Sequence, residues 1–313
     1  MIKIIENQSE IAAGTRGSSL GIGAMKVVSQ TAEDGFFGKF ETINIINENH
    51  LLNFPTPYNF AKRIDGLVKI YDRTCSTISK VLKDGDFPLV LSGDHACAGG
   101  TIAGIKKAYP NKRIGVVWID AHADIHTPYT TPSGNIHGMP LATALNEDNL
   151  DAKINQLDEK TTNLWNQLKQ IGDIAPKINV EDIVYISVRD TEKPEDDFIE
   201  KHQIKNYSVD EIRAKGQEVV LDEIKTKLSD CDLIYVSFDV DSMDCILVSK
   251  GTGTPVEHGL SPTEADFFLT HLAQWNKTAC IEFVEINPCL DDKINKMAET
   301  AYDILKEVVK HIK

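Results

Sequence analysis

Ile114-Gly-Val-Val-Trp-Ile-Asp-Ala-His-Ala-Asp124 joins an unbroken apolar run to three side chains that can bind a metal ion. Continuous apolar runs of this length are typical of strands that are buried on both faces of a parallel sheet. Asp120, His122 and Asp124 follow at every second position, and alternate residues of an extended chain point to the same side. Because two carboxylates and an imidazole at one point need a compensating cation, the stretch predicts a buried strand that ends in a metal site.

Three more apolar runs end in carboxylates or a histidine. They are followed by Ser92-Gly-Asp-His95, Asp239-Val-Asp241 and Glu285-Ile-Asn-Pro288. The carboxyl ends of parallel strands lie at the same edge of a sheet, where ligands of open α/β folds bind. We therefore expect these side chains to meet those of the 120–124 stretch.

Strand-like runs alternate with helical patterns along the chain. Strands are expected at 42–47, 88–92, 114–120, 182–188, 233–239 and 280–286, and helices at 60–83, 98–108, 217–229, 262–274 and 291–312. This alternation predicts the α/β class, with helices on both faces of a mainly parallel central sheet in a three-layer α/β/α arrangement.

No linker, low-complexity tract or repeat divides the chain, so a single domain over residues 1–313 is expected. Within it, residues 146–178 are polar and read as a helical insertion. Its apolar stripe consists of Leu150, Ile154, Leu157, Leu164, Trp165 and Leu168.

The net charge of −14 disfavours nucleic acid as a partner. It either serves solubility or attracts a small cationic substrate into an acidic cleft. No segment approaches the roughly 18 apolar residues of a membrane span, and the N-terminus has no signal-peptide pattern. The six cysteines include no CxxC pair, so a cytoplasmic protein with reduced thiols is expected.

The candidate metal ligands are too many for one ion. They are His95, Asp120, His122, Asp124, Asp239 and Asp241. Two divalent cations would balance the four carboxylates, and oxygen-rich ligation without thiolate suits Mn²⁺ better than structural zinc. Two adjacent metal ions can produce a hydroxide at neutral pH and polarise an electrophile, so hydrolysis is the expected reaction class.

Together the motifs resemble the ureohydrolase superfamily and, within it, arginase, over about residues 88 to 290. The resemblance is carried by residues 120–124, Ser133-Gly-Asn-Ile-His-Gly-Met-Pro140, 237–241, Gly251-Thr-Gly-Thr-Pro255 and 285–288. The 133–138 motif separates arginase from agmatinase and formimidoylglutamase. The resemblance implies an arginase/deacetylase-like fold and a homo-oligomer, either a trimer or a hexamer.

The resemblance also implies a ligand set for two Mn²⁺ ions. Asp120 and Asp239 would bridge the ions; His95 and Asp124 would complete one, and His122 and Asp241 the other. A hydroxide bridging the metals would attack the guanidinium carbon of L-arginine, giving L-ornithine and urea, and Asp124 would pass a proton to the leaving amine.

Further roles follow from the same resemblance. His137 would be a proton shuttle and Glu285 the partner of the guanidinium group, which a carboxylate matches in bidentate geometry. Ser133 and Asn135 would bind the α-carboxylate, and Thr254 of the 251–255 motif would also contact substrate.

The chain departs from the arginase pattern in three places. His126 replaces the usual asparagine that meets the α-carboxylate, and a histidine can still donate to it. Glu192 stands where an aspartate commonly meets the α-amino group, and the loop after Asp241 is one residue longer.

Three alternatives remain open. The first is another ureohydrolase of the same fold, an agmatinase, a formimidoylglutamase or a guanidino-acid hydrolase. The second is a catalytically silent relative that only binds a metal or a partner. The third is a one-zinc, histone-deacetylase-like hydrolase, against which His95 argues because it would belong to a second ion.

Overall fold

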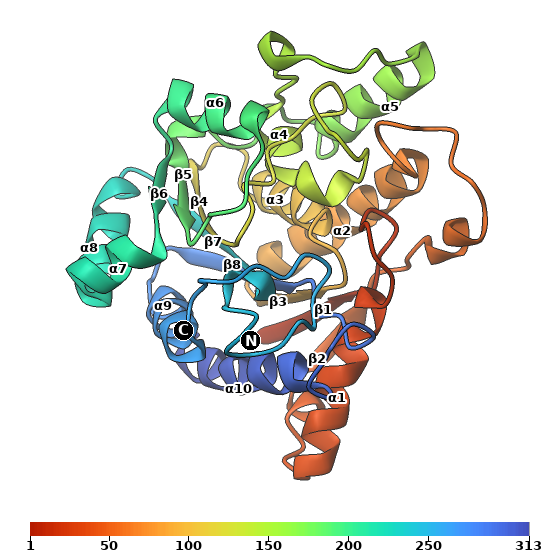
Figure 1. Cartoon of the computed structure of the whole chain (residues 1–313). Coiled ribbons are helices and arrows are strands. Elements are labelled where there is room, and N and C mark those ends of the chain that lie inside the picture. The colour runs from red at the N-terminus through yellow and green to blue at the C-terminus, as the bar shows by residue number, and fades with distance from the viewer. Residues whose placement is uncertain (313) are drawn as a thin grey trace.

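One sheet of eight strands, all parallel, forms the centre of the computed structural model, which describes residues 1–312 (Figure 1). The strands are β1 (Ile2–Asn7), β2 (Glu41–Asn44), β3 (Phe87–Ser92), β4 (Ile114–Ile119), β5 (Ile183–Ile186), β6 (Lys205–Tyr207), β7 (Leu233–Asp239) and β8 (Thr278–Val284). Their order across the sheet is β2-β1-β3-β8-β7-β4-β5-β6. The predicted parallel sheet is confirmed, and the strands that carry the site motifs lie next to one another.

Successive residues of the strands belong to two separate apolar cores. Val117 packs into one core and Val116 into the other, and Leu89 and Val90 divide in the same way. This alternation follows from the period of two along an extended chain. Because both sides of each strand are apolar, both faces of the sheet need a layer of helices.

Helices cover both faces, which confirms the three-layer α/β/α prediction (Figure 1). On one face lie α1 (Gly21–Ala32), α7 (Val209–Lys215), α8 (Gln217–Lys227), α9 (Pro262–Ala273) and α10 (Lys296–His311). On the other lie α2 (Ile64–Lys83), α3 (Cys97–Ala108), α4 (Pro140–Leu145) and α6 (Lys193–His202). None of the helices in residues 1–312 combines the length and the apolar character that crossing a membrane requires.

Two strands, β1 and β6, were not expected from the sequence. Four helices, α1, α4, α6 and α7, were also not expected. The strand β6 has three residues, Lys-Asn-Tyr, at one edge of the sheet, too few and too polar to give a periodic signal. The predicted helix at 291–312 begins only at Lys296, because Asp291 accepts the backbone N–H of Met297 at 2.8 Å and forms a turn before the helix.

The polar segment at 146–178 contains one α-helix, α5 (Glu159–Gln170). Trp165 and Leu168 of the predicted stripe are buried against α2, whereas Leu150 and Ile154 are exposed and precede the helix. The segment therefore packs on the α2 layer through its second half only, away from the sheet (Figure 1).

Candidate metal centre and substrate cleft

The six side chains predicted as metal ligands come together at the carboxyl edge of the sheet. Asp120 follows β4, Asp239 ends β7, and His95 lies in the turn between β3 and α3. Five of the six residues are buried, and His122 is partly exposed. Since β3, β8, β7 and β4 are adjacent, the parallel topology brings these strand ends to one place.

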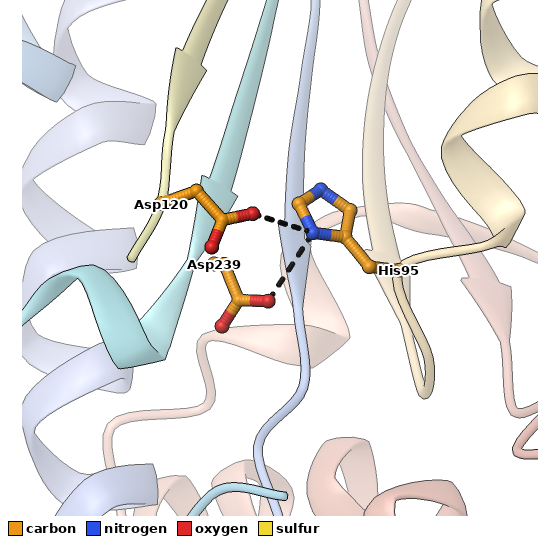
Figure 2. A group of neighbouring side chains, drawn as sticks. All are labelled: His95, Asp120 and Asp239. Atoms are coloured by element: carbon orange, nitrogen blue, oxygen red, sulfur yellow. Dashed lines mark ion pairs between the residues drawn. The ribbon is translucent and has the colours of Figure 1, made fainter. Parts of the chain in front are cut away.

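The imidazole of His95 is held in one orientation by two neighbours on the sheet. Its ring stacks on the indole of Trp118, with ring centroids 4.1 Å apart and planes 4° from parallel. Its Nε2 lies 2.7 Å from the hydroxyl oxygen of Ser237. Figure 2 shows the ring directed at Asp120 and Asp239, with Nδ1 toward both carboxylates.

The other ring nitrogen of His95 points at a cluster of carboxylate oxygens. Nδ1 lies 3.0 Å from Asp120 Oδ2, 3.0 Å from Asp124 Oδ2 and 3.2 Å from Asp239 Oδ2. Among residues 1–312 it has no partner in hydrogen-bonding geometry. In the tautomer that donates from Nε2 to Ser237, a lone pair faces three oxygens, which is the arrangement of ligands around a cation.

A second group shares one carboxylate with the first. Asp120, His122 and Asp241 have ligand atoms within 4.8 Å of one another, as do His95, Asp120 and Asp239. His122 Nδ1 lies 3.1 Å from Asp241 Oδ2 and 3.5 Å from Asp120 Oδ1. Asp120 thus stands between two donor groups, and this arrangement fits a pair of divalent ions.

Backbone N–H groups fix the carboxylates of this second group. The N–H of His122 donates to Asp120 Oδ1 at 2.7 Å, and that of Ala121 donates to Asp241 Oδ1 at 3.1 Å. The indole N–H of Trp118 donates to Asp120 Oδ2 at 2.9 Å. The carboxylates are therefore placed before any cation arrives, which reduces the ordering that binding requires.

Burial and mutual repulsion act on the charges of the cluster. Burial raises the pKa of Asp124 and of Asp239, and the nearby charge of Asp120 raises both further. Burial also raises the pKa of Asp241. Ionised carboxylates in this position are unfavourable without a cation, so the cluster favours divalent metal ions of the kind that oxygen-rich sites take.

His137 and Glu285 meet beside the metal ligands. His137 Nδ1 lies 3.3 Å from Glu285 Oε1, and the same oxygen accepts the backbone N–H of His95 at 3.0 Å. Glu285 and Asp124 both have left-handed backbone conformations, with φ of 65° and 51°. Such conformations cost about 1 kcal/mol in residues other than glycine. Asp124 lines the cleft, and Glu285 contacts it through His137.

His126 forms a third group with two glutamates from the start of α6. Its Nε2 lies 2.7 Å from Glu192 Oε2 and 3.5 Å from Glu195 Oε2, and its Nδ1 lies 3.0 Å from the hydroxyl oxygen of Thr130. Both ring nitrogens of His126 therefore have partners within the protein. Burial raises the pKa of Glu195 to about 7, although its two oxygens accept the backbone N–H groups of Ile125 and Glu192.

The three groups surround one cleft with a volume of about 280 Å³, a size suited to a small molecule. Ser133, Asn135 and Thr254 line it, as do His137 and Asp124. The Ser133 hydroxyl accepts the backbone N–H of Asn135 at 3.2 Å, so its proton remains free to donate into the cleft. The hydroxyl of Thr254 instead donates to Asp241 Oδ2 at 3.0 Å, so Thr254 supports a metal-ligand candidate directly.

Several residues of the site were missed in the sequence. Trp118 and Ser237 precede Asp120 and Asp239 by two positions, so the strand period alone could have placed them on the same face. Glu195 could have been found from the Glu192-Lys-Pro-Glu195 pattern of a capping box, which the structure forms. Gly14 and Thr15 also line the cleft and carry no such signal.

A parallel sheet with a histidine–aspartate centre at its carboxyl edge defines an α/β protein of the kind that binds ligands beyond its strand ends. The model of the Arginase family matches residues 9–310, and the chain belongs to this family. It is an arginase-type ureohydrolase, a hydrolase of linear amidines that forms urea.

Individual relatives agree with this assignment. The arginase of Bacillus subtilis is 36% identical over 248 residues, which are 79% of this chain and 77% of that protein. The native structure of arginase from Bacillus caldovelox has a TM-score of 0.83 at 32% identity, over 98% of this chain and 97% of the other. The structure of Entamoeba histolytica arginase in complex with L-ornithine has a TM-score of 0.82 at 25% identity, over 98% of both chains.

Proposed function

We propose that this protein hydrolyses L-arginine to L-ornithine and urea with two Mn²⁺ ions. The observation that carries the proposal is a single cleft that joins two histidine–aspartate groups, which share Asp120, to hydrogen-bond donors at its rim. The substrate would place its cationic guanidinium group at the acidic floor. Its α-carboxylate would meet the donors of Ser133 and Asn135.

The donor set suits manganese. Four carboxylates and two imidazoles would hold two divalent ions, with His95 and Asp124 completing one, His122 and Asp241 the other, and Asp120 and Asp239 between them. When bound, the ions would supply a hydroxide nucleophile at neutral pH and neutralise the charge that develops on the substrate. The orphaned Nδ1 of His95 supports a cation at this position.

Glu285 and His137 would position the reacting group and move its protons. The carboxylate of Glu285 can pair with a planar guanidinium through two hydrogen bonds, and it lies next to His137, which lines the cleft. His137 contacts Glu285 and lines the same cleft, so it can exchange a proton between the departing amine and solvent. The carboxylate of Asp124 would carry a proton to the leaving nitrogen.

The rim of the cleft matches a zwitterionic amino-acid tail. Ser133 and Asn135 present donors on one wall, which suit a carboxylate. Asp190, Glu192 and Glu195 also line the cleft and add an acidic character that suits an α-ammonium group. Agmatine keeps the ammonium group but lacks the α-carboxylate, so it would leave the donors of Ser133 and Asn135 unpaired.

His126 would take part through an exchange of partners. In the free protein its Nε2 contacts Glu192, and both residues line the cleft. The α-carboxylate of the substrate would replace Glu192 on His126, and the released Glu192 carboxylate would then turn to the α-ammonium group. This exchange accounts for the joint presence of a histidine and a longer acidic side chain at these two positions.

A substrate panel tests the proposal against the other ureohydrolases. Manganese-loaded protein would be assayed for urea release from L-arginine, agmatine and 4-guanidinobutyrate, and for release of formamide and glutamate from formimidoylglutamate. We expect kcat/KM for L-arginine to exceed that for the other substrates. Faster turnover of agmatine or of a guanidino acid without an α-amino group would replace the arginine assignment, and no turnover of any of them would indicate a silent relative.

A further inference from the structure

Lys62 contacts the substrate-tail segment from outside the cleft. Its Nζ donates to Asn135 Oδ1 at 3.1 Å, and its backbone N–H donates to the carbonyl oxygen of Gly134 at 2.8 Å. The lysine lies in the loop before α2, 73 positions away from Asn135 in the sequence. Nothing in the sequence motifs pointed to it.

The loop of Lys62 and the turn at 133–135 are closely packed. Gly134 has a φ of 76°, and a Cβ atom at this position would overlap the carbonyl oxygen of Asn59. A side chain at residue 134 is therefore excluded both by the left-handed backbone and by the neighbouring loop. This packing fixes the distance between Lys62 and Asn135.

The lysine determines which end of the Asn135 amide faces the cleft. An ammonium group only donates hydrogen bonds, so it binds the amide oxygen and not the amide nitrogen. Asn135 Nδ2 consequently points away from Lys62 and lies 2.9 Å from the position that a Cβ on Gly14 would occupy. Both Gly14 and Asn135 line the cleft, so the amide presents its donor end on this wall.

We propose that Lys62 is a positioning residue that sets the preference for substrates with a carboxylate tail. With Lys62 in place, Asn135 offers N–H groups to a carboxylate, which only accepts. Without it, the amide can turn its oxygen toward the cleft and repel the same carboxylate. The lysine also places a positive charge next to Asn135. The proposal rests on the proposed arginine-hydrolysing function.

Kinetics of two variants at this position test the proposal. Lys62→Met keeps the length of the side chain and the backbone bond to Gly134 but cannot bind Asn135 Oδ1. We expect its KM for L-arginine to rise about tenfold, the order expected for a lost charge-assisted hydrogen bond, with kcat within about twofold. The kinetics with agmatine should stay within about twofold. Lys62→Arg, which can still donate to Asn135 Oδ1, should restore the KM for L-arginine.

Lys69→Met is the matched control, because it also removes one positive charge by the same lysine-to-methionine change. Lys69 lies in α2 and pairs with Glu48. This variant should leave both substrates unaffected. If Lys62→Met slowed arginine and agmatine equally, or left the KM for arginine unchanged, the positioning role of Lys62 would be excluded. The same conclusion would follow if Lys69→Met reproduced its effect.

Product binding gives a readout that does not depend on turnover. Titration calorimetry would compare L-ornithine with putrescine, which lacks the carboxylate. Lys62→Met should weaken L-ornithine about tenfold and leave putrescine unchanged. A wild-type protein that does not prefer arginine to agmatine would refute the proposed function itself. A wild-type preference that survives in Lys62→Met would refute only the role of Lys62.

Discussion

Ser237 Oγ lies 2.7 Å from His95 Nε2 and thereby leaves His95 Nδ1 to face three carboxylates. Hydrogen bonds of this kind fix the tautomer and orientation of a metal-binding histidine. We expect Ser237→Ala to weaken Mn²⁺ binding by about 10- to 100-fold, measured by titrating metal-stripped protein. Ser79→Ala, at a buried serine of α2, is the control. Equal losses in both variants would contradict a specific role for Ser237.

Removal of metal should destabilise the protein. Chelation would leave buried carboxylates without a cation, so the midpoint of thermal unfolding should fall and added Mn²⁺ should restore it. At a free metal concentration of 100 times Kd, the gain per site is about 2.7 kcal/mol. Mass spectrometry under native conditions should count two ions per chain, and one zinc ion would contradict the two-manganese proposal.

Asp239→Asn should have opposite effects on the stability of the metal-free protein and on metal binding. The amide removes one charge from the buried cluster, so the metal-free variant should unfold at a higher temperature than metal-free wild type. Added Mn²⁺ should stabilise the variant much less than the wild type, because one shared ligand is lost. Calorimetric scans with and without metal measure both effects. A lower unfolding temperature for the metal-free variant would contradict this electrostatic account.

Glu285→Gln should reduce catalysis without loss of metal. The amide oxygen can still accept the backbone N–H of His95, so the turn should keep its structure. Its neutral amide cannot form a charged pair with guanidinium, and kcat/KM for L-arginine should fall by about 10²- to 10³-fold. Metal analysis of the purified variant is the control. Wild-type kinetics in this variant would exclude Glu285 as the guanidinium partner.

His126→Asn should strengthen arginine binding if the exchange of partners occurs. An asparagine at this position can donate to the α-carboxylate and leaves Glu192 free, so no internal contact has to break. We expect KM for L-arginine to fall by about three- to tenfold, the range of one neutral hydrogen bond, with agmatine unchanged. An increase in KM for arginine would show that the histidine itself is the better carboxylate partner.

Lys177 should make stability depend on pH in the alkaline range. Burial lowers its pKa from 10.5 to about 8, and its Nζ donates to the carbonyl oxygen of Lys169 at 2.6 Å. Between about pH 8 and 10.5 the unfolded chain binds more protons, so the free energy of unfolding should rise with pH. The shift corresponds to roughly 3 kcal/mol. Lys177→Met should lack this rise in urea unfolding compared across that range, and an identical pH dependence in both proteins would contradict the assignment.

The parts of the site that follow a buried strand could be predicted from the sequence. Asp120 and Asp239 end apolar strands, so parallel topology alone brings them together, and the fold class rests on the same periodicity. The pairing of His126 with Glu192 could not be read, because it joins loops 66 positions apart that have no periodic pattern. The contact between Lys62 and Asn135 could not be predicted for the same reason.

The order of the strands in the sheet determines when, during synthesis, the metal site can form. β3 and β4 are synthesised early, but β7 and β8 lie between them in the finished sheet. A chain emerging from the ribosome therefore holds His95 and Asp120 on strands that have no direct contact until the last third of the sequence arrives and inserts. Metal capture has to be a late event in folding, and a truncation before β7 should yield a polypeptide that is aggregation-prone and metal-free.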